Sequence, residues 1–387
     1  MTEILLFGAS GHTGRLTARA LAERGASFGI AGRDPTALGP IAEATGADFV
    51  RPADAADPDS LVRALRGVRV LVSCVGPFMD LGRAAARAAL RAGVNYLDSI
   101  GEPAWAAELL RLDAAARRRG IAMAPAMGWD EVPGDVAATV AVAHSEGMGR
   151  SAGPDEIHAR SSRREAGSGK GADLTITYAL PSEASTGTLR SAVRIVGTQG
   201  VWWCAGRPVQ VRAGQSQRWV PMPPGLGVRS SLAWPLAEAH LAPLHLPLAS
   251  IRTFVTAGSL AQKGLWALRP VLPLLAAPKR ADAAAHVLRR AVPEPSGPGG
   301  GRWTILAEGR AGNHRRNVVM MGGDPYGLTA SMLAAGAEIL ARPGYGVTGV
   351  VAPVTAVGLE TLQTELARTG VVSEVLEWPL HEEAGVS

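Results

Sequence analysis

Cysteine is almost absent from this sequence of 387 residues. It occurs only as Cys74 and Cys204, and neither belongs to a Cys-x-x-Cys pair. Two isolated thiols provide neither a disulfide framework nor the ligand spacing of a zinc site. We therefore predict a reduced, cytoplasmic setting and no metal site.

Long apolar runs are also missing. The most apolar stretch, residues 264–278, is interrupted by Arg269 and by prolines at positions 270, 273 and 278. A membrane-spanning helix needs about 20 consecutive apolar residues, so this stretch is too short and too broken to cross a bilayer. Residues 1–9 carry no basic segment and are predicted to form a strand rather than a signal peptide. We predict no transmembrane segment.

Lysine is scarce as well, with three lysines beside 36 arginines in a chain of net charge +5. In a sequence this rich in alanine and glycine, the skew indicates codon bias rather than selection for a polyanionic partner. The basic residues are scattered apart from a short stretch at 160–164, so we predict no nucleic-acid partner. Apolar residues make up 47%, which is enough for the cores of two domains.

The first 125 residues do contain a regular alternation of short apolar runs and helical patterns. Strands are expected at residues 4–7, 28–31, 48–51, 68–74, 95–97 and 121–124, separated by five helices. This alternation is typical of a parallel, doubly wound sheet, and right-handed crossovers favour the strand order 3-2-1-4-5-6. We predict an α/β fold with an N-terminal Rossmann domain.

The pattern changes after residue 125. Short strand-like runs at 174–178, 189–196 and 201–204 are broken by glycine and serine, and runs at 303–308 and 317–321 pair naturally. These runs predict an inserted α+β domain with an antiparallel sheet. We place the Rossmann domain at residues 1–127, completed by a helix at about 325–342. The second domain is placed at residues 128–324 and 343–387.

The first turn carries three glycines in the spacing Gly-x-x-Gly-x-x-Gly, at Gly8, Gly11 and Gly14. They follow a strand and open a helix, which is the context in which this motif indicates dinucleotide binding. Gly8 permits the sharp turn, Gly11 lets the backbone approach a pyrophosphate, and Gly14 lets the helix pack on the strand. The helix N-terminus then offers N–H groups to the phosphates. Other loop residues assigned to this cofactor site are Ser10, His12 and Thr13.

The end of the second strand decides which dinucleotide binds. An acidic residue there would accept a hydrogen bond from the ribose 2′-hydroxyl and favour NAD. The sequence instead has Arg33 after Gly32, and a guanidinium there can pair with a 2′-phosphate. Asp34 is expected to cap the next helix, although it could instead turn inward onto the ribose. We predict NADP(H), with Asp54 either at the adenine edge or in a turn.

Ligands of open α/β sheets bind beyond the carboxyl ends of the strands. The residues after the fourth strand should therefore line the nicotinamide pocket, and they are Cys74, Val75, Gly76, Pro77 and Phe78. A catalytic Tyr-x-x-x-Lys pair is absent, because none of the four tyrosines is followed by lysine four positions later. The proton donor must therefore come from elsewhere.

Four carboxyl groups are candidates for this proton donor, and one of them, Asp135 after the sixth strand, could instead be an N-cap. Asp98 ends the fifth strand, Glu102 follows four residues later, and Asp130 lies after the sixth strand. A carboxyl with a raised pKa can serve as a general acid. Each has a structural alternative: Asp98 could cap a turn, Glu102 could favour a helix N-terminus, and Asp130 could fix a loop. Asp130 ranks first among them.

Several short segments strengthen this interpretation. They are VSCVGPF at 72–78, AGVNYLD at 92–98, GE at 101–102, GWDEVPGD at 128–135, GGDP at 322–325 and AP at 352–353. With them the chain resembles the saccharopine dehydrogenase-like oxidoreductases, well over residues 1–142 and moderately over 320–358. The resemblance implies an inserted substrate domain, often with a homodimer formed through it. Members of the family include amino-acid-forming imine reductases and trans-acting enoyl reductases.

These observations predict an NADP(H)-dependent reductase or dehydrogenase that transfers hydride to an activated C=C or C=N bond of a biosynthetic intermediate. The chain is also similar in length to the trans-acting enoyl reductases. Its substrate domain shows no evident pair of Arg or Lys residues that could bind two carboxylates, which argues against saccharopine as the substrate. Apolar segments at 232–246 and 264–278 could wall a pocket for a small-molecule or acyl substrate, either unattached or carrier-bound. They could equally be core helices. The alternative is a non-catalytic NADP-sensing or membrane-associated binding protein of the same fold.

Overall fold

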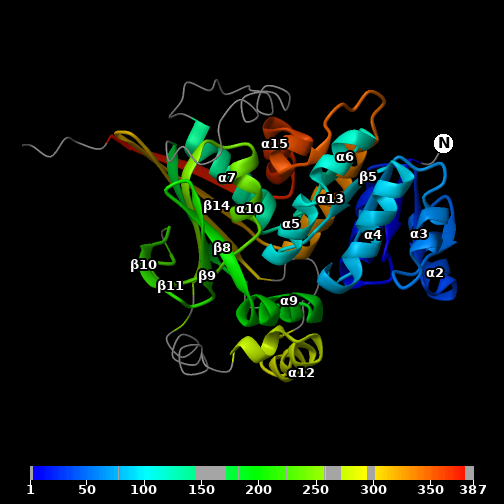
Figure 1. The fold of residues 1–387 in the computed structure, drawn as a ribbon, viewed down its shortest axis with the longest axis horizontal. Coiled ribbons are helices and arrows are strands. Elements are labelled where there is room, and N and C mark those ends of the chain that lie inside the picture. Colours follow the sequence, from blue (N-terminus) through cyan, green and yellow to red (C-terminus); the bar gives the residue numbers. More distant parts are fainter. Residues whose placement is uncertain are drawn as a thin grey trace, which may run out of the picture. The chain divides into compact units, whose positions relative to one another are not determined.

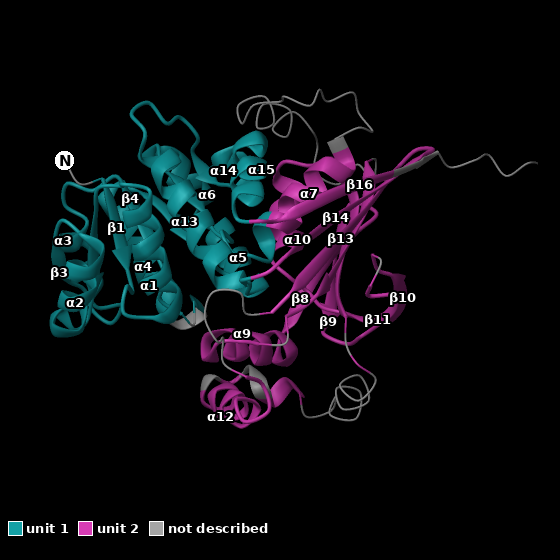
Figure 2. Cartoon of the chain, turned by 180° about the vertical axis from the view of Figure 1, so that it is seen from behind, with its two compact units in different colours: residues 1–132, 324–369 teal, residues 133–323, 370–387 magenta. Residues whose placement is uncertain are grey.

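The computed structural model describes residues 3–76, 78–143, 171–181, 183–223, 225–256, 258, 272–293 and 301–379. The chain forms two compact units, each made of segments that are distant in sequence (Figure 2). Unit 1 comprises residues 1–132 and 324–369, and unit 2 comprises residues 133–323 and 370–387.

Unit 1 is built on a seven-stranded sheet. Its strands are β1 (Ile4–Phe7), β2 (Phe28–Gly32), β3 (Val50–Pro52), β4 (Val70–Ser73), β5 (Asn95–Asp98), β6 (Ala122–Ala124) and β15 (Gly349–Val350). Their order is β15-β6-β5-β4-β1-β2-β3, and all neighbours run parallel. The predicted Rossmann order 3-2-1-4-5-6 is confirmed. Residues of β1, β2 and β4 are buried on both faces, which explains their uninterrupted apolar sequences.

Helices connect these strands and return from the C-terminal part of the chain (Figure 1). They are α1 (His12–Glu23), α2 (Pro35–Thr45), α3 (Pro58–Ala64), α4 (Phe78–Ala92), α5 (Pro103–Leu110), α6 (Asp113–Arg119), α13 (Pro325–Ala341), α14 (Pro353–Val357) and α15 (Leu359–Arg368). Local sequence sets several of their ends. Asp57 caps α3 by accepting from the backbone N–H groups of Asp59 and Ser60, and α6 stops at Gly120, whose φ is +66°.

Residues 343–369 belong to unit 1, whereas the sequence analysis assigned them to the second domain. The short strand β15 adds to the edge of the sheet beside β6, and the backbone N–H of Val350 donates to Asp113 Oδ1 at 2.8 Å. Arg24, the C-cap of α1, also binds this segment, since its guanidinium lies 3.0 Å from Glu365 and also 2.7 Å from Glu338 on α13. A two-residue strand carries no sequence period, so the boundary was not visible in the pattern.

Unit 2 contains a nine-stranded sheet. Its strands are β7 (Ala172–Ala179), β8 (Gln199–Cys204), β9 (Arg207–Arg212), β10 (Gln217–Pro221), β11 (Val228–Ala233), β12 (Leu248–Thr256), β13 (Trp303–Ala311), β14 (His314–Gly322) and β16 (Val372–Pro379). The main order is β10-β11-β12-β7-β13-β14-β16, and β8 pairs with β12 and β9. The predicted hairpin of β13 and β14 is confirmed. The sheet is mixed rather than antiparallel, because β12 and β7 run parallel.

One predicted strand of unit 2 is a helix. Residues 189–196 lie within α9 (Thr186–Gly197), whose N-cap Ser185 accepts from the backbone N–H of Thr188. Leu189 and Val193 are four positions apart and pack against α12 (Pro278–Leu288), which lies beside α9 in Figures 1 and 2. Burial of this helical stripe outweighs the preference of the β-branched residues for a strand.

Further helices of unit 2 pack on or near its sheet. They are α7 (Glu131–Ala143), which begins at the end of unit 1, α10 (Glu238–Leu241) and the 3-10 turns η2 (Ala242–Leu244) and η3 (Leu272–Ala276). A Cβ at Gly309 of β13 would lie 2.7 Å from the Ala141 carbonyl oxygen, so this glycine lets α7 approach the sheet. Within the described ranges, no helix is long and apolar enough to cross a membrane.

Asn95 connects three parts of unit 1. Its Nδ2 donates to the Leu340 carbonyl at 2.8 Å, and its Oδ1 accepts from the Ala122 N–H at 2.9 Å. We expect Asn95→Ala to lower the free energy of unfolding by about 1–3 kcal/mol, because both backbone groups lose their partner. Urea denaturation measures this effect. Asn313→Ala, at an exposed turn position, is the control; equal midpoints for the two variants would contradict the assigned role.

Candidate functional site

The turn between β1 and α1 is closely packed at two of its three glycines. Gly8 has a φ of +89°, and a Cβ there would lie 2.6 Å from Val75 Cγ2 in the loop after β4. A Cβ at Gly14 would overlap the Gly8 carbonyl oxygen and lie 2.9 Å from Ala9 Cα. Larger residues at either position would therefore separate α1 from the sheet.

Gly11 differs from the other two glycines because the protein itself leaves room for a side chain there. The nearest atom to a Cβ at Gly11 would be the Gly8 carbonyl oxygen at 3.4 Å. Gly11 is the N-cap of α1, makes no side-chain cap hydrogen bond, and is followed by a first turn without acidic residues. The first N–H groups of a helix have no partner within the helix, so this turn can bind an anion.

The other residues assigned to this turn surround the helix N-terminus. Ser10 and His12 are exposed, and the His12 ring meets the Tyr326 ring edge-on at a centroid distance of 4.9 Å. Thr13 is half-buried, and its carbonyl accepts a hydrogen bond from the Thr17 hydroxyl at 2.8 Å. The turn therefore presents backbone and small polar groups around Gly11.

A cavity of about 400 Å³ lies at the carboxyl ends of β2 and β3, and both Arg33 and Asp54 line it. Asp34 does not turn inward: its Oδ1 accepts from the N–H groups of Thr36 and Ala37, as an N-cap of α2. The 2′-hydroxyl of a ribose in this cavity would therefore meet Arg33 rather than a carboxylate from the end of β2.

Arg33 differs from the other arginines of this cavity. Arg51 donates to the Ala64 and Arg66 carbonyls, and Arg63 pairs with Asp57 at 3.2 Å. Arg33 is exposed and makes no hydrogen bond or ion pair within the described part of the chain. Its guanidinium is thus available to an incoming anion.

Asp54 closes a turn, which was one of its two predicted roles. Its Oδ1 accepts from the Ala56 N–H at 3.0 Å, and its own N–H donates to Ser60 Oγ at 3.0 Å. The carboxylate still lines the cavity and stays half-buried. The adenine-edge contact remains a prediction.

The loop after β4 lies beside the glycine turn. Cys74 and Val75 are half-buried, Gly76 is exposed, Phe78 begins α4, and Pro77 lies outside the described residues. The sulfur of Cys74 is 3.8 Å from the Thr17 hydroxyl. Burial raises the pKa of this thiol to about 12, so it is protonated at neutral pH and is not a nucleophile.

Asp98 is fully buried and accepts four hydrogen bonds. Its donors are the Tyr96 hydroxyl at 2.8 Å, the Trp105 indole N–H at 2.9 Å, and the N–H groups of Ile100 and Ala126, each at 3.2 Å. Burial raises the pKa of Asp98, while these donors oppose the shift. The last of them holds Ala126 at a φ of +64°. This environment is that of a carboxylate that ties together the loops after β5 and β6.

Two further candidate carboxyls, Glu102 and Asp130, lie on these same loops. Glu102 is 2% exposed and is the N-cap of α5, without a side-chain cap hydrogen bond. Asp130 is half-buried, and a Cβ added to Gly128 would lie 2.9 Å from its Oδ1. The neighbouring Glu131 is buried against Gly101 and was missed by the sequence analysis. Small residues thus make room here for two adjacent carboxylates.

A separate polar cluster lies within unit 2 around the start of α7. Asp135 Oδ1 is 2.7 Å from His245 Nε2, and both side chains are buried. Tyr178 donates a short hydrogen bond to Glu238, and a Cβ at Gly134 would overlap the Tyr178 hydroxyl. His245 stands alone between leucines in the sequence, so no spacing pointed to it. The described residues contain no group of three or more His, Cys, Asp or Glu that could hold a metal ion.

Comparison with known proteins identifies the first part of the chain. Residues 4–123 match the family model of the saccharopine dehydrogenase NADP binding domain. The cofactor predicted from the sequence, NADP, is the one named in the description of this family model.

Two relatives match a stretch of the chain somewhat longer than this domain. A lipid droplet localized protein of Caenorhabditis elegans is 33% identical over 147 residues, which is 35% of this chain and 34% of that protein. A putative trans-acting enoyl reductase of Mycobacterium tuberculosis is 33% identical over 141 residues, with the same shares. The match therefore spans about a third of the length of these relatives.

One solved structure shares the fold over the whole length of both chains. It is the apo, histidine-tagged saccharopine dehydrogenase (L-Glu forming) of Saccharomyces cerevisiae. The TM-score is 0.60 at 12% sequence identity, and the alignment covers 98% of this chain and 100% of the yeast chain. The similarity shows that the two chains share a fold.

The residues of the NADP-binding domain fit the cofactor. Gly11 leaves a space that a side chain would fill, directly at the N-terminus of α1. Arg33 lines a cavity beyond β2, where a 2′-phosphate requires a cation. The pyrophosphate would thus be held by the α1 turn and the 2′-phosphate by Arg33.

The glycines allow a test that separates folding from cofactor binding. We expect Gly14→Ala to lower the free energy of unfolding by about 1–3 kcal/mol, because its Cβ overlaps the Gly8 carbonyl. Gly11→Ala should cost no more than about 1 kcal/mol, yet weaken NADPH binding roughly tenfold or more by displacing the pyrophosphate. Thermal unfolding and calorimetric titration measure the two effects. Unchanged NADPH affinity in Gly11→Ala would contradict the placement of the cofactor.

A double-mutant cycle tests the structural role of Asp98. In Asp98→Asn, the NH2 group replaces one carboxylate oxygen and must face one of two pairs of donors. The side with Tyr96 and Trp105 is preferred because the Tyr96 hydroxyl can accept, and there the Trp105 indole N–H, which can only donate, loses its acceptor. We expect a loss of about 1–3 kcal/mol in unfolding free energy, and a smaller loss for the same substitution in the Trp105→Phe background. Urea denaturation of the four proteins gives the coupling. Equal losses in both backgrounds would refute the coupling between Asp98 and Trp105.

Proposed function

We propose that this protein is an NADPH-dependent reductase that transfers hydride to an activated C=C or C=N bond of a biosynthetic intermediate. The observation that carries the cofactor part is the cavity beyond β2, where Arg33 lacks an ion pair in the described chain and Asp34 is committed to its helix cap. The names of the mycobacterial relatives support enoyl reduction as one form of this reaction.

Three parts of unit 1 each bind a different group of the cofactor. The N-terminus of α1 holds the pyrophosphate through backbone N–H groups, and Arg33 holds the 2′-phosphate. The loop formed by Cys74, Val75 and Gly76 follows β4 beside Gly8, so it is the part of the chain that we assign to the nicotinamide. When bound, the nicotinamide would supply the hydride.

The same proposal assigns the proton to Asp130. Among the candidate carboxyls, Asp98 uses its oxygens on four donors, Glu102 is almost completely buried, and Asp135 is buried beside His245. Asp130 is half-buried in the loop after β6 and keeps access to solvent. A partly exposed carboxyl can be reprotonated after each turnover, which a general acid requires.

The substrate and the assembly belong to the proposal as well. We infer a small-molecule or acyl substrate, either unattached or carried by a partner protein, and a homodimer in the cytoplasm. The alternative function is an NADP-sensing or membrane-associated protein that binds the cofactor without turnover.

The cofactor assignment predicts a selective effect at Arg33. Arg33→Ala should weaken NADPH binding roughly tenfold or more and leave NADH binding nearly unchanged, because only NADPH carries the 2′-phosphate. Fluorescence titration of both nucleotides measures this. The control is Arg19→Ala, an exposed position on α1. Equal losses for NADPH and NADH would refute the contact with the 2′-phosphate.

The reaction itself is tested with NADPH deuterated at C4 of the nicotinamide. The purified chain is offered one α,β-unsaturated acyl thioester and one cyclic imine, and deuterium in the product is measured by mass spectrometry. Deuterium in either product supports the reductase and identifies the reduced bond. Tight NADPH binding without transfer to either acceptor would refute the reductase in favour of the sensing alternative.

A further inference from the structure

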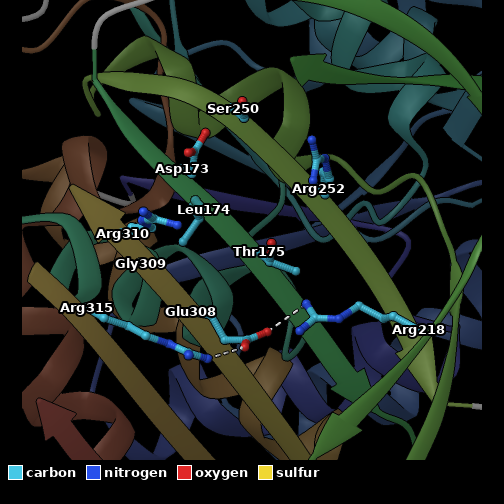
Figure 3. A pocket seen from close by; sticks show the side chains of 10 residues that line it. All are labelled: Asp173, Leu174, Thr175, Arg218, Ser250, Arg252, Glu308, Gly309, Arg310 and Arg315. Carbon is cyan, nitrogen blue, oxygen red and sulfur yellow. Dashed lines mark hydrogen bonds and ion pairs between the residues drawn. The ribbon is translucent and has the colours of Figure 1, made fainter. Parts of the chain in front are cut away.

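A second basic cavity, of about 310 Å³, lies within unit 2. Arginines from four strands line it: Arg218 of β10, Arg252 of β12, Arg310 of β13 and Arg315 of β14. Thr175 lies on the central strand β7. Figure 3 shows Arg310 and Arg315 on one side of it and Arg218 and Arg252 on the other. These arginines are far apart in sequence, so their spacing gave no sign that they share a site.

Glu308 neutralises two of the four arginines. Its carboxylate lies 2.7 Å from Arg218 Nη1 and 3.1 Å from Arg315 Nη2, and only 10% of its side chain is exposed. One carboxylate thus bridges the two sides of the cavity (Figure 3). This bridge holds Arg218 and Arg315 in place.

Arg252 and Arg310 have no such partner. Neither makes an ion pair or hydrogen bond through its side chain within the described residues, although both line the cavity. Asp173 lies directly opposite Arg310 in the strand register, but the two form no ion pair. Four arginines against two carboxylates leave the lining with a net formal charge of +2.

The strand register makes this arrangement unfavourable without a ligand. Arg310 and Arg315 are direct partners across the β13–β14 ladder, and like charges at such positions destabilise a sheet. Arg310 is exposed and 44% of the Arg315 side chain is exposed, so water screens part of this repulsion. An anion between the arginines would remove the repulsion.

We propose that this cavity binds a phosphate group, as the dianion of a phosphate monoester or of inorganic phosphate. A dianion matches the net charge of +2, and its tetrahedral oxygens can accept from guanidinium groups on both sides of β7. The hydroxyls of Thr175 and Ser250 line the same space and can donate to a remaining oxygen. The site lies in unit 2, whereas Arg33 and the glycine turn belong to unit 1, and it goes beyond the proposed reduction.

The first test measures phosphate affinity by calorimetry at constant ionic strength, with inorganic phosphate as the probe. All proteins carry Gly11→Ala and Arg33→Ala, so that neither the α1 turn nor the cofactor cavity of unit 1 contributes to the difference between them. We expect Arg252→Ala/Arg310→Ala to weaken binding roughly tenfold or more. The control Arg207→Ala/Arg280→Ala removes the same charge from exposed positions outside the cavity and should leave the affinity unchanged. Equal affinity in all three proteins, or no binding, would overturn the proposal.

A second variant predicts a change of opposite sign. Glu308→Gln removes the internal anion, releases Arg218 and Arg315, and raises the net charge of the cavity, so phosphate should bind several-fold more tightly. Thermal unfolding without phosphate reports whether the variant is folded. A merely structural Glu308 would lower stability without raising the affinity, and a folded variant of unchanged or weaker affinity would count against the site.

Two further probes identify the ligand class. Succinate tests the competing dicarboxylate chemistry, and binding as tight as that of phosphate would overturn the choice of phosphate. Glycerol 3-phosphate tests the source of the phosphate group. Tighter binding of this ester than of inorganic phosphate supports a phosphorylated metabolite as the ligand, and the reverse order supports the inorganic anion.

Discussion

The close approach of α1 to β1 is the constraint on which the candidate site depends. No Cβ fits at Gly14 because the Gly8 carbonyl oxygen and Ala9 occupy its place. With the helix this close, its N-terminus points beyond the end of β1, between the loops that follow β2 and β4. Gly8 meets Val75 across that edge, so the turn also fixes the neighbouring loop. The open N-terminus of α1 and the position of the loop after β4 both follow from this packing.

Most carboxylates near this edge of the sheet have structural roles. Asp34 and Asp57 cap helices, Asp54 closes a turn, and Asp98 ties two loops together through four donors. The Asp34 cap keeps that carboxylate away from the cavity, whereas Asp54 and Asp57 line it beside three arginines, Arg33, Arg51 and Arg63. The consequence is a cationic cavity at Arg33, which suits a 2′-phosphate better than a ribose hydroxyl.

In unit 2, charged residues gather around a cavity of the sheet. Its mixed sheet brings arginines from separate strands to one cavity, and one nearly buried glutamate neutralises only two of them. Isolated ion pairs near the surface contribute little to stability. The proposed phosphate site would use the positive charge that this lining leaves unpaired on Arg252 and Arg310.

The sequence by itself determined the Rossmann order, the glycine turn, the caps at Asp34 and the identity of the cofactor. These depend on local rules: apolar runs, glycines at fixed spacing and the residue that ends β2. Only the tertiary structure decided the rest. In the tertiary structure, residues 189–196 form a helix and β15 pairs with the sheet of unit 1. Asp98 is buried, and Arg252 and Arg310 line one cavity. Each of these outcomes depends on contacts between segments far apart in the chain, and no local pattern records such contacts.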